Sequence, residues 1–182
     1  MPRAGRRHLH RASRRCSYLR GKCGENLRAS FNAIIRACVS ISPVDRQRGD
    51  NLPIYQHIVA QLKSLGHVVL TEHVADPNVL VRERKAPARE VYQRDVDWLN
   101  QADVVIAEIS TPSLGVGYEI GYTLRRGTPT LCVYCEGLFV SKMITGNPSP
   151  HLTVATYRDE RELDQHLIAF LDHQLQAVGT AD

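Results

Sequence analysis

The sequence predicts an α/β protein in which a doubly wound parallel sheet of five strands lies between two layers of helices. From about residue 50 onward, short apolar runs alternate with amphipathic stretches, and this alternation is typical of parallel β/α units. The run Asp103–Glu108 is apolar between two acids, as expected of a strand buried on both faces. A length of 182 residues with 43% hydrophobic content suffices for one core of ordinary size and not for two.

The first half of this body predicts a helix, a strand, a loop and a second helix. Asp50 or Asn51 can cap the first helix, Pro53 suits its first turn, and Gly66 ends it. Its apolar residues recur at helical spacing, at positions 54, 58, 62 and 65. The elements expected next are a strand at His67–Leu70, a charged and proline-punctuated loop at Thr71–Pro87, and a helix at about Ala88–Gln101 that directs Val91, Trp98 and Leu99 inward.

The second half repeats the pattern after the buried strand. A glycine-containing loop, Ile109–Gly117, leads into a helix from about Val116 to Arg126, which Gly127 ends. The last helix has three acids in its first turn, as the helix dipole favours. The remaining expected elements are strands at Pro129–Tyr134 and Leu152–Ala155 and that final helix at about Asp159–Ala177, with Leu163, Leu167, Phe170 and Leu171 on one stripe.

A sheet of five strands needs one more strand before the first helix. Only four strands are evident after residue 50, so the missing strand is expected within Ser30–Ile41. Two segments there have suitable composition, Phe31–Ile35 and Cys38–Ile41. The sequence does not decide between them.

Charge divides the chain at about residue 48. Residues 1–48 carry 12 Lys/Arg and 2 Asp/Glu, whereas residues 49–182 carry 11 and 17. The basic stretch could bind nucleic acid or resemble a mitochondrial transit peptide. Its composition also fits a disordered extension or a misassigned start, and we interpret it in this way. We therefore expect a divergent or disordered extension at 1–48, one catalytic domain at 49–176 and a tail at 177–182, with no nucleic-acid polymer as partner.

Two features of the sequence indicate the cellular compartment that we expect for the protein. No apolar run approaches the roughly 20 residues that cross a bilayer, and the start lacks the apolar core of a secretory signal, so we expect no membrane partner. Five cysteines, an odd number, fit a reducing compartment, cytoplasmic and possibly also nuclear. Cys132 and Cys135 form a C-x-x-C pair in a β-type run, where residues three apart point to opposite faces. We interpret them as structural and expect neither a metal nor a cofactor.

Candidate catalytic residues gather where parallel strands end. In an open parallel sheet, ligands bind at the carboxyl ends of the strands. The segment Ser110–Glu119 follows the buried strand and combines small residues with free N–H groups at a helix start, which suits an anionic ligand. Glu119 lies about one turn into that helix, and Asp95 lies on the preceding helix between inward-facing positions.

Each acid also has a purely structural interpretation. Glu119 could complement the helix dipole, and Asp95 could be a buried cap or hydrogen-bond anchor. Together, however, two carboxylates meeting in one pocket can divide into one ionised group and one proton-sharing group. This is the equipment for glycosidic bond cleavage, in which one carboxylate attacks or steadies an oxocarbenium-like carbon and an acid assists the leaving group.

Four motifs stand out along the chain, at Thr71–Ala75, Arg94–Leu99, Ala102–Glu108 and Pro112–Gly121. They closely resemble motifs of the 2′-deoxynucleoside 5′-phosphate N-hydrolases of the nucleoside 2-deoxyribosyltransferase superfamily. The similarity spans about residues 50–172, and the Pro-Ser-Leu-Gly-Val-Gly-Tyr-Glu-x-Gly run is its most specific part. The resemblance implies a homodimer of flavodoxin-like subunits that hydrolyses the N-glycosidic bond of 2′-deoxynucleoside 5′-monophosphates.

The resemblance also implies residue roles. Glu119 matches the family's nucleophilic glutamate, which takes the deoxyribosyl group covalently before water releases 2-deoxyribose 5-phosphate. Asp95 matches the aspartate that positions the glutamate and the sugar and handles protons. Ser113 and Gly115 match loop contacts to phosphate and sugar, and His73 matches a residue on the base side of the pocket.

Two further residues of the site are implied to come from a second subunit. Ser141 and Met143 match a Ser-x-Met that the neighbouring subunit contributes, with the serine on the phosphate. Because each pocket then depends on its partner, dimerisation is expected to be required for activity.

The amino-terminal part departs from the family. The family's first strand ends in Tyr-Phe-x-Gly-Ser-Ile-Arg-Gly-Gly, which holds the sugar and the 5′-phosphate, and this chain lacks that run. Spacing from Tyr55 places the phosphate-binding arginine near Arg46, whereas the local pattern around Arg36 fits better but needs an insertion of about ten residues. Our hypothesis is a divergent or wrongly joined amino terminus on an intact enzyme body.

Two other functions remain open at this stage. A nucleoside 2-deoxyribosyltransferase would transfer the sugar to a second base in place of water. A catalytically inactive nucleotide-binding homologue is favoured by the missing phosphate loop. Ser141 and the Pro112–Gly121 motif favour hydrolysis of a phosphorylated substrate.

Overall fold

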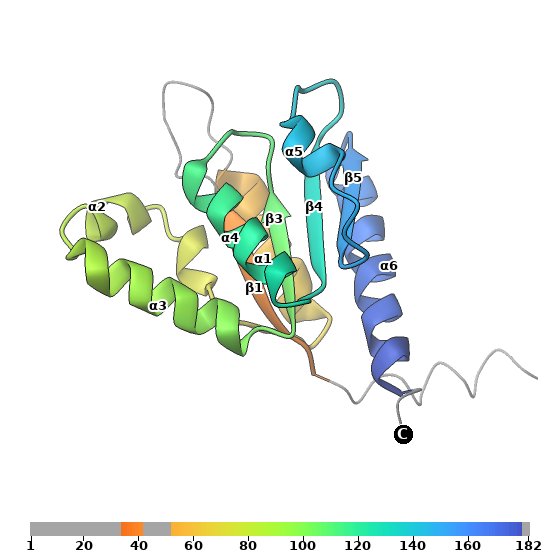
Figure 1. Cartoon of the computed structure of the whole chain (residues 1–182), viewed down its shortest axis with the longest axis horizontal. Coiled ribbons are helices and arrows are strands. Elements are labelled where there is room, and N and C mark those ends of the chain that lie inside the picture. Colours follow the sequence, from red (N-terminus) through yellow and green to blue (C-terminus); the bar gives the residue numbers. More distant parts are fainter. Residues whose placement is uncertain (1–33, 42–51, 180–182) are drawn as a thin grey trace, which may run out of the picture. The chain divides into compact units, whose positions relative to one another are not determined.

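A computed structural model of the chain describes residues 34–41 and 52–179 (Figure 1). These residues contain a five-stranded sheet in the order β2-β1-β3-β4-β5, with every neighbouring pair parallel. The predicted α/β class and parallel sheet are confirmed, and the order is that of flavodoxin-like folds. The strands are β1 Arg36–Ile41, β2 Val68–Val69, β3 Val104–Glu108, β4 Thr130–Cys135 and β5 Leu152–Tyr157.

Helices cover the two faces of the sheet unequally. Apolar residues of α1 and α6 pack with one face, and residues of α3 and α4 pack with the other. In β3 the side chains alternate between the two faces: Val104 and Ile106 lie on the α1 and α6 side, whereas Val105 and Ala107 lie on the α3 and α4 side. The helices are α1 Leu52–Ser64, η1 Glu72–Ala75, α2 Val79–Glu83, α3 Ala88–Gln101, α4 Leu114–Arg125, α5 Lys142–Thr145 and α6 Glu160–Gly179.

Strand β1 decides between the two segments proposed for the first strand. It comprises Arg36–Ile41 and pairs with β2 on one side and β3 on the other, so the alternative at Cys38–Ile41 is confirmed. The boundary expected between residues 48 and 49 is therefore wrong, because a central strand of the sheet lies before it. At the other end α6 continues to Gly179, past the expected start of the tail at 177.

Two predicted loops contain helix. The segment Thr71–Pro87 includes η1 and α2, and the Asp76 carboxylate accepts a hydrogen bond from the Asn78 N–H (2.8 Å) just before α2 begins. Helix α4 begins at Leu114, two residues earlier than expected, because the Ser113 side chain caps it. Helical turns as short as η1 and α2 contain too few residues for apolar periodicity to reveal them.

Helix α3 is less buried than its sequence suggests. Leu99 is buried, but Val91 and Trp98 are only half-buried, so the prediction that all three point into the core is wrong. Figure 1 shows the reason: α3 lies near the sheet at its C-terminal end and diverges from it toward α2. The Trp98 ring instead lies 4.7 Å from the His73 ring and 4.9 Å from the Arg94 guanidinium.

Several local predictions are confirmed. Gly66 and Gly127, which follow α1 and α4, have φ angles of 85° and 75°, a left-handed conformation that favours glycine. Cys132 is buried on the α4 side, whereas Cys135 packs against the core on the α1 and α6 side, so the two thiols point to opposite faces. None of the helices in the described part of the chain is both long and apolar enough to span a membrane.

Candidate active site

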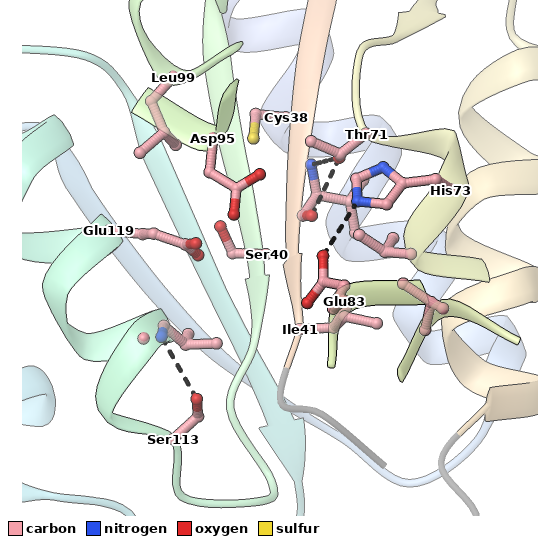
Figure 2. Close-up of a pocket in the computed structure, with 15 residues that line it drawn as sticks. Cys38, Ser40, Ile41, Thr71, His73, Glu83, Asp95, Leu99, Ser113 and Glu119 are labelled. Carbon is pink, nitrogen blue, oxygen red and sulfur yellow. Dashed lines mark hydrogen bonds and ion pairs between the residues drawn. The ribbon is translucent and has the colours of Figure 1, made fainter. Parts of the chain in front are cut away.

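A cavity of about 220 Å³ opens at the carboxyl ends of β1 and β3. The strand order reverses between these two strands, and such switch points are where open α/β sheets bind ligands. Strand β1 supplies one side, η1, α2 and α3 supply a second, and the first turns of α4 supply a third (Figure 2). Its polar lining residues are Cys38, Ser40, Thr71, His73, Glu83, Asp95, Ser113 and Glu119.

The structure brings Asp95 and Glu119 into this one cavity. Figure 2 shows the two side chains approaching it from α3 and α4. Burial raises the pKa of the Glu119 carboxyl to about 6, and the negative charges of Asp95 and Glu83 add to the rise. Burial also raises the pKa of Asp95, although Arg94 opposes that shift. Two half-buried carboxylates with raised pKa values are the pair that glycosidic chemistry requires.

Arg94 and Glu83 organise the α3 side of the cavity. The Arg94 guanidinium donates to Asp95 Oδ1 through Nε (2.8 Å) and to Glu83 Oε1 through Nη2 (2.7 Å). This fork fixes Asp95 in orientation and ties α2 to α3. Neither Glu83 nor Arg94 was predicted as a site residue. Arg94 adjoins Asp95 in a quoted motif, whereas Glu83 lies in a segment interpreted as a loop, so no periodicity marked it.

His73 also lines the cavity. Burial lowers the pKa of His73, and the Arg94 charge lowers it further. The imidazole is therefore neutral at pH 7, beside the Trp98 ring, with Nε2 3.7 Å from Glu83 Oε1. A neutral ring next to an aromatic surface suits a flat, uncharged ligand group such as a nucleobase.

Ser113 and Gly115 lie at the start of α4 on the cavity wall. The Ser113 hydroxyl accepts a hydrogen bond from the Val116 N–H (3.4 Å), so its first role is to cap the helix. Capping places the free N–H groups of the first turn beside the cavity, where they can bind an anion.

Two predicted site residues do not lie in this cavity. Ser141 and Met143 line a separate groove between α4 and α5, and the Ser141 hydroxyl accepts from the Met143 N–H (3.3 Å). Arg46 lies outside the described residues. The alternative, Arg36, is at the amino end of β1 and forms an ion pair with Asp103 (2.7 Å), at the opposite edge of the sheet from the cavity. Arg36 is therefore excluded as the phosphate ligand of this site.

The described lining of the cavity is acidic. It contains Glu83, Asp95 and Glu119 but no lysine or arginine. Across residues 34–41 and 52–179, no group of three or more His, Cys, Asp or Glu side chains could hold a metal ion. The described residues thus offer carboxylate chemistry, with helix N–H groups as the available anion donors.

Comparison with known proteins identifies the family. A family model described as nucleoside 2-deoxyribosyltransferase matches residues 44–143, which is more than half of the chain. The chain belongs to the nucleoside 2-deoxyribosyltransferase family. The predicted family is therefore confirmed, and both Asp95 and Glu119 fall within the matched region.

Relatives within the family resemble the chain at about 40% identity. A Methanosarcina mazei protein with the provisional name 2′-deoxynucleoside 5′-phosphate N-hydrolase 1 is 40% identical over 120 residues, covering 66% of this chain and 74% of that protein. The Mus musculus 5-hydroxymethyl-dUMP N-hydrolase is 45% identical over 97 residues, covering 51% of this chain and 56% of the mouse protein.

Two solved structures share the fold. The Clostridium botulinum CMP N-glycosidase superposes with a TM-score of 0.54 at 19% identity, over 74% of this chain and 98% of that chain. A 2-deoxyribosyltransferase from Bacillus psychrosaccharolyticus gives a TM-score of 0.51 at 18% identity, over 71% and 90%. At these identities the likeness establishes the fold alone.

Proposed function

We propose that the protein hydrolyses the N-glycosidic bond of 2′-deoxynucleoside 5′-monophosphates, releasing the base and 2-deoxyribose 5-phosphate. The observation that carries the proposal is the pair of carboxylates, Asp95 and Glu119, in one cavity at the switch point of the sheet. The names of relatives at 40–45% identity, which are N-hydrolases of deoxynucleotides, support this choice of reaction.

In the proposed reaction Glu119 is the nucleophile. A Glu119 carboxylate oxygen forms a bond to C1′ of the sugar while the C1′–N bond breaks and its electron pair leaves with the base. Water then attacks C1′, and the C1′–O bond to Glu119 breaks. With a pKa of about 6, Glu119 is mostly ionised at pH 7 and still basic enough to attack. No cofactor is needed for either step.

Asp95 moves the proton in both steps. Its raised pKa suits a group that donates a proton toward the departing base and later accepts one from the attacking water. The fork from Arg94 holds Asp95 in the orientation that this requires. His73, on the same side of the cavity, is the proposed contact for the base.

We assign the 5′-phosphate to the amino end of α4. Ser113, Gly115 and the first-turn N–H groups provide an anion site there. Because no cationic side chain of the described residues lines the cavity, we add two further phosphate ligands, Arg46 of the same subunit and Ser141 of the partner subunit.

Free cysteines support a reducing location, in the cytoplasm or nucleus.

The homodimer is supported by an apolar groove that adjoins the cavity. Ser113 and Val116 line both. Three large apolar residues that line the groove are exposed to solvent: Leu114 is 96% exposed, and Phe139 and Met143 are each 81% exposed. Large apolar side chains exposed together in this way mark an interaction surface. A second copy seated there would cover them and bring its own Ser141 toward this cavity.

Transfer of the sugar to a second base is the competing function. The family's own description and the acidic lining of the cavity, which does not favour a phosphate dianion, both support it. Purified protein should be incubated with each of the four deoxynucleoside monophosphates and with the unphosphorylated deoxynucleosides, with and without an acceptor base. Free base with 2-deoxyribose 5-phosphate is the expected product. A new nucleoside that forms only with the acceptor base would instead establish the transferase.

A further inference from the structure

Ser40 is a buried hydroxyl without a hydrogen bond, next to the two carboxylates of the cavity. It lies near the carboxyl end of β1 and is 3% exposed. Its Oγ has no hydrogen-bond partner within the described part of the chain. Thr71, buried nearby, differs: its hydroxyl donates to the Val39 carbonyl (3.0 Å) and accepts from the Val39 N–H (2.8 Å). Burying a hydroxyl unpaired costs free energy, so the Ser40 hydroxyl is available to a group that completes the site.

Figure 2 shows Ser40 between Asp95 and Glu119, with its side chain directed into the cavity. Of the two acids, Glu119 is the one that responds to it, because the nearby Ser40 hydroxyl lowers the pKa of Glu119 while Asp95 and Glu83 raise it. The pKa of Asp95 is set by its burial and by Arg94.

The other groups facing Ser40 leave it few alternatives. Cys38, two residues earlier on β1, is a neutral thiol because burial raises its pKa to about 12. On the opposite wall, His73 and Glu83 lie beside each other, and Arg94 is engaged by Glu83 and Asp95. Glu119 is thus the nearby acid without a cationic partner among these groups, and a neutral donor is what remains to orient it.

We propose that Ser40 is a positioning residue for the nucleophile. The Ser40 O–H donates to one Glu119 oxygen, which leaves the other oxygen aligned with C1′ of the bound substrate. After attack, the same O–H donates to the carbonyl oxygen of the glycosyl ester and stabilises the carboxylate that leaves when water attacks. Ser40 keeps its proton throughout. This inference rests on the proposed function, since it assigns a partner to the proposed nucleophile.

The first test is a pH profile. Without the Ser40 hydroxyl, the pKa of Glu119 should rise, so the acid limb of kcat/KM should move to higher pH. We expect Ser40→Ala to lower kcat about tenfold or more, as for loss of a hydrogen bond to a charged group, with little change in KM. Ser40→Thr keeps the hydroxyl and should restore both the limb and most of kcat. Ser40→Cys fills the same space with a weak donor and should also shift the limb, which keeps the test open if the alanine variant unfolds.

The second test needs no turnover. In protein labelled with 13C at the glutamate carboxyl carbons, the Glu119 resonance is assigned as the one that Glu119→Gln removes. Its titration midpoint should rise in Ser40→Ala and return in Ser40→Thr. An unchanged midpoint together with an unchanged acid limb would overturn the proposal, as would a defect confined to KM. A shifted midpoint in a wild-type protein that cleaves no nucleotide would instead refute the proposed function and leave the Ser40–Glu119 interaction standing.

Discussion

The two faces of the sheet carry different kinds of structure, and one glutamate on each face shows the contrast. On the face covered by α1 and α6 the buried apolar residues form one continuous cluster. On the other face α3 diverges, the core divides into two smaller clusters, and the cavity occupies the space left between α3 and α4. The α1 and α6 face therefore contributes mainly to stability, whereas the α3 and α4 face is less densely packed and contains the candidate active site.

Glu108, on the α1 and α6 face, and Glu119, on the α3 and α4 face, differ in their surroundings. Glu108 is 1% exposed, and its Oε1 accepts hydrogen bonds from the Tyr157 hydroxyl (3.1 Å), the Ser110 N–H (3.2 Å) and the Ser110 hydroxyl. The Ser110 hydroxyl in turn accepts from the Cys135 N–H (2.9 Å), so Glu108 joins the ends of β3, β4 and β5. Glu119 instead faces two other carboxylates. Burial raises the pKa of both, but only one is held by several donors.

The largest effect is expected from Glu119→Gln. Loss of the nucleophile should lower kcat by a factor on the order of 1,000 or more, which is about 4 kcal/mol in barrier, while the protein remains folded. Single-turnover release of base, followed by chromatography, measures this. Glu90→Gln, an exposed acid in the first turn of α3, is the matched control and should be fully active. Full activity of Glu119→Gln would remove Glu119 from the mechanism.

Glu108→Ala should have the opposite signature. It leaves the Tyr157 and Ser110 donors without their acceptor and should lower the free energy of unfolding by about 3 kcal/mol, measured by urea denaturation. The folded fraction should keep its kcat. Glu108→Gln retains an acceptor oxygen and should cost much less. Loss of kcat in fully folded Glu108→Ala would show that the two faces are not separate in function.

Leu114→Asp tests whether the open face is completed by a second subunit. A charge at this exposed position should leave the subunit's unfolding free energy almost unchanged but should block association. At micromolar protein we expect a monomer in sedimentation and a fall in kcat/KM of about tenfold. Val81→Asp, at an exposed apolar residue outside the groove, is the control. A fully active monomer would contradict the shared site.

The smallest effect is a pH dependence of stability. Folding raises the pKa of Glu119 from 4.5 to about 6, so the folded state favours its protonated form. This contribution is fully present below pH 4.5 and is lost as pH rises through about 6. Glu119→Gln should therefore be more stable than wild type above pH 6.5, by on the order of 1–2 kcal/mol, and equally stable near pH 4. Urea midpoints across this range measure the difference; a constant difference would contradict the raised pKa.

The sequence was most informative where one physical signal dominates. Continuous apolar runs predicted β3 and β4, and glycines predicted the ends of α1 and α4. Strand β1 was ambiguous because two adjacent segments have similar composition. Helices η1 and α2 were missed because each is only about one turn long and lies in a charged segment without apolar periodicity.

The candidate site divides in the same way. Asp95 and Glu119 were selected because each lies at a recognisable position on a helix, and the structure brings them together. Glu83 and Ser40 were missed because only the tertiary arrangement gives them a role. Trp98 was misplaced because helical periodicity cannot show that a helix diverges from the sheet at one end.

The place of β1 has a consequence for how the protein can be divided. It is the earliest described strand in the chain and yet lies inside the sheet, with β2 and β3 as neighbours. The family match begins at residue 44, after β1 has ended. A fragment that begins at residue 44 and keeps the rest of the chain would expose two unpaired strand edges, one on β2 and one on β3, which invite pairing with other chains. Residues that sequence similarity would discard are thus the ones that keep the sheet from aggregating.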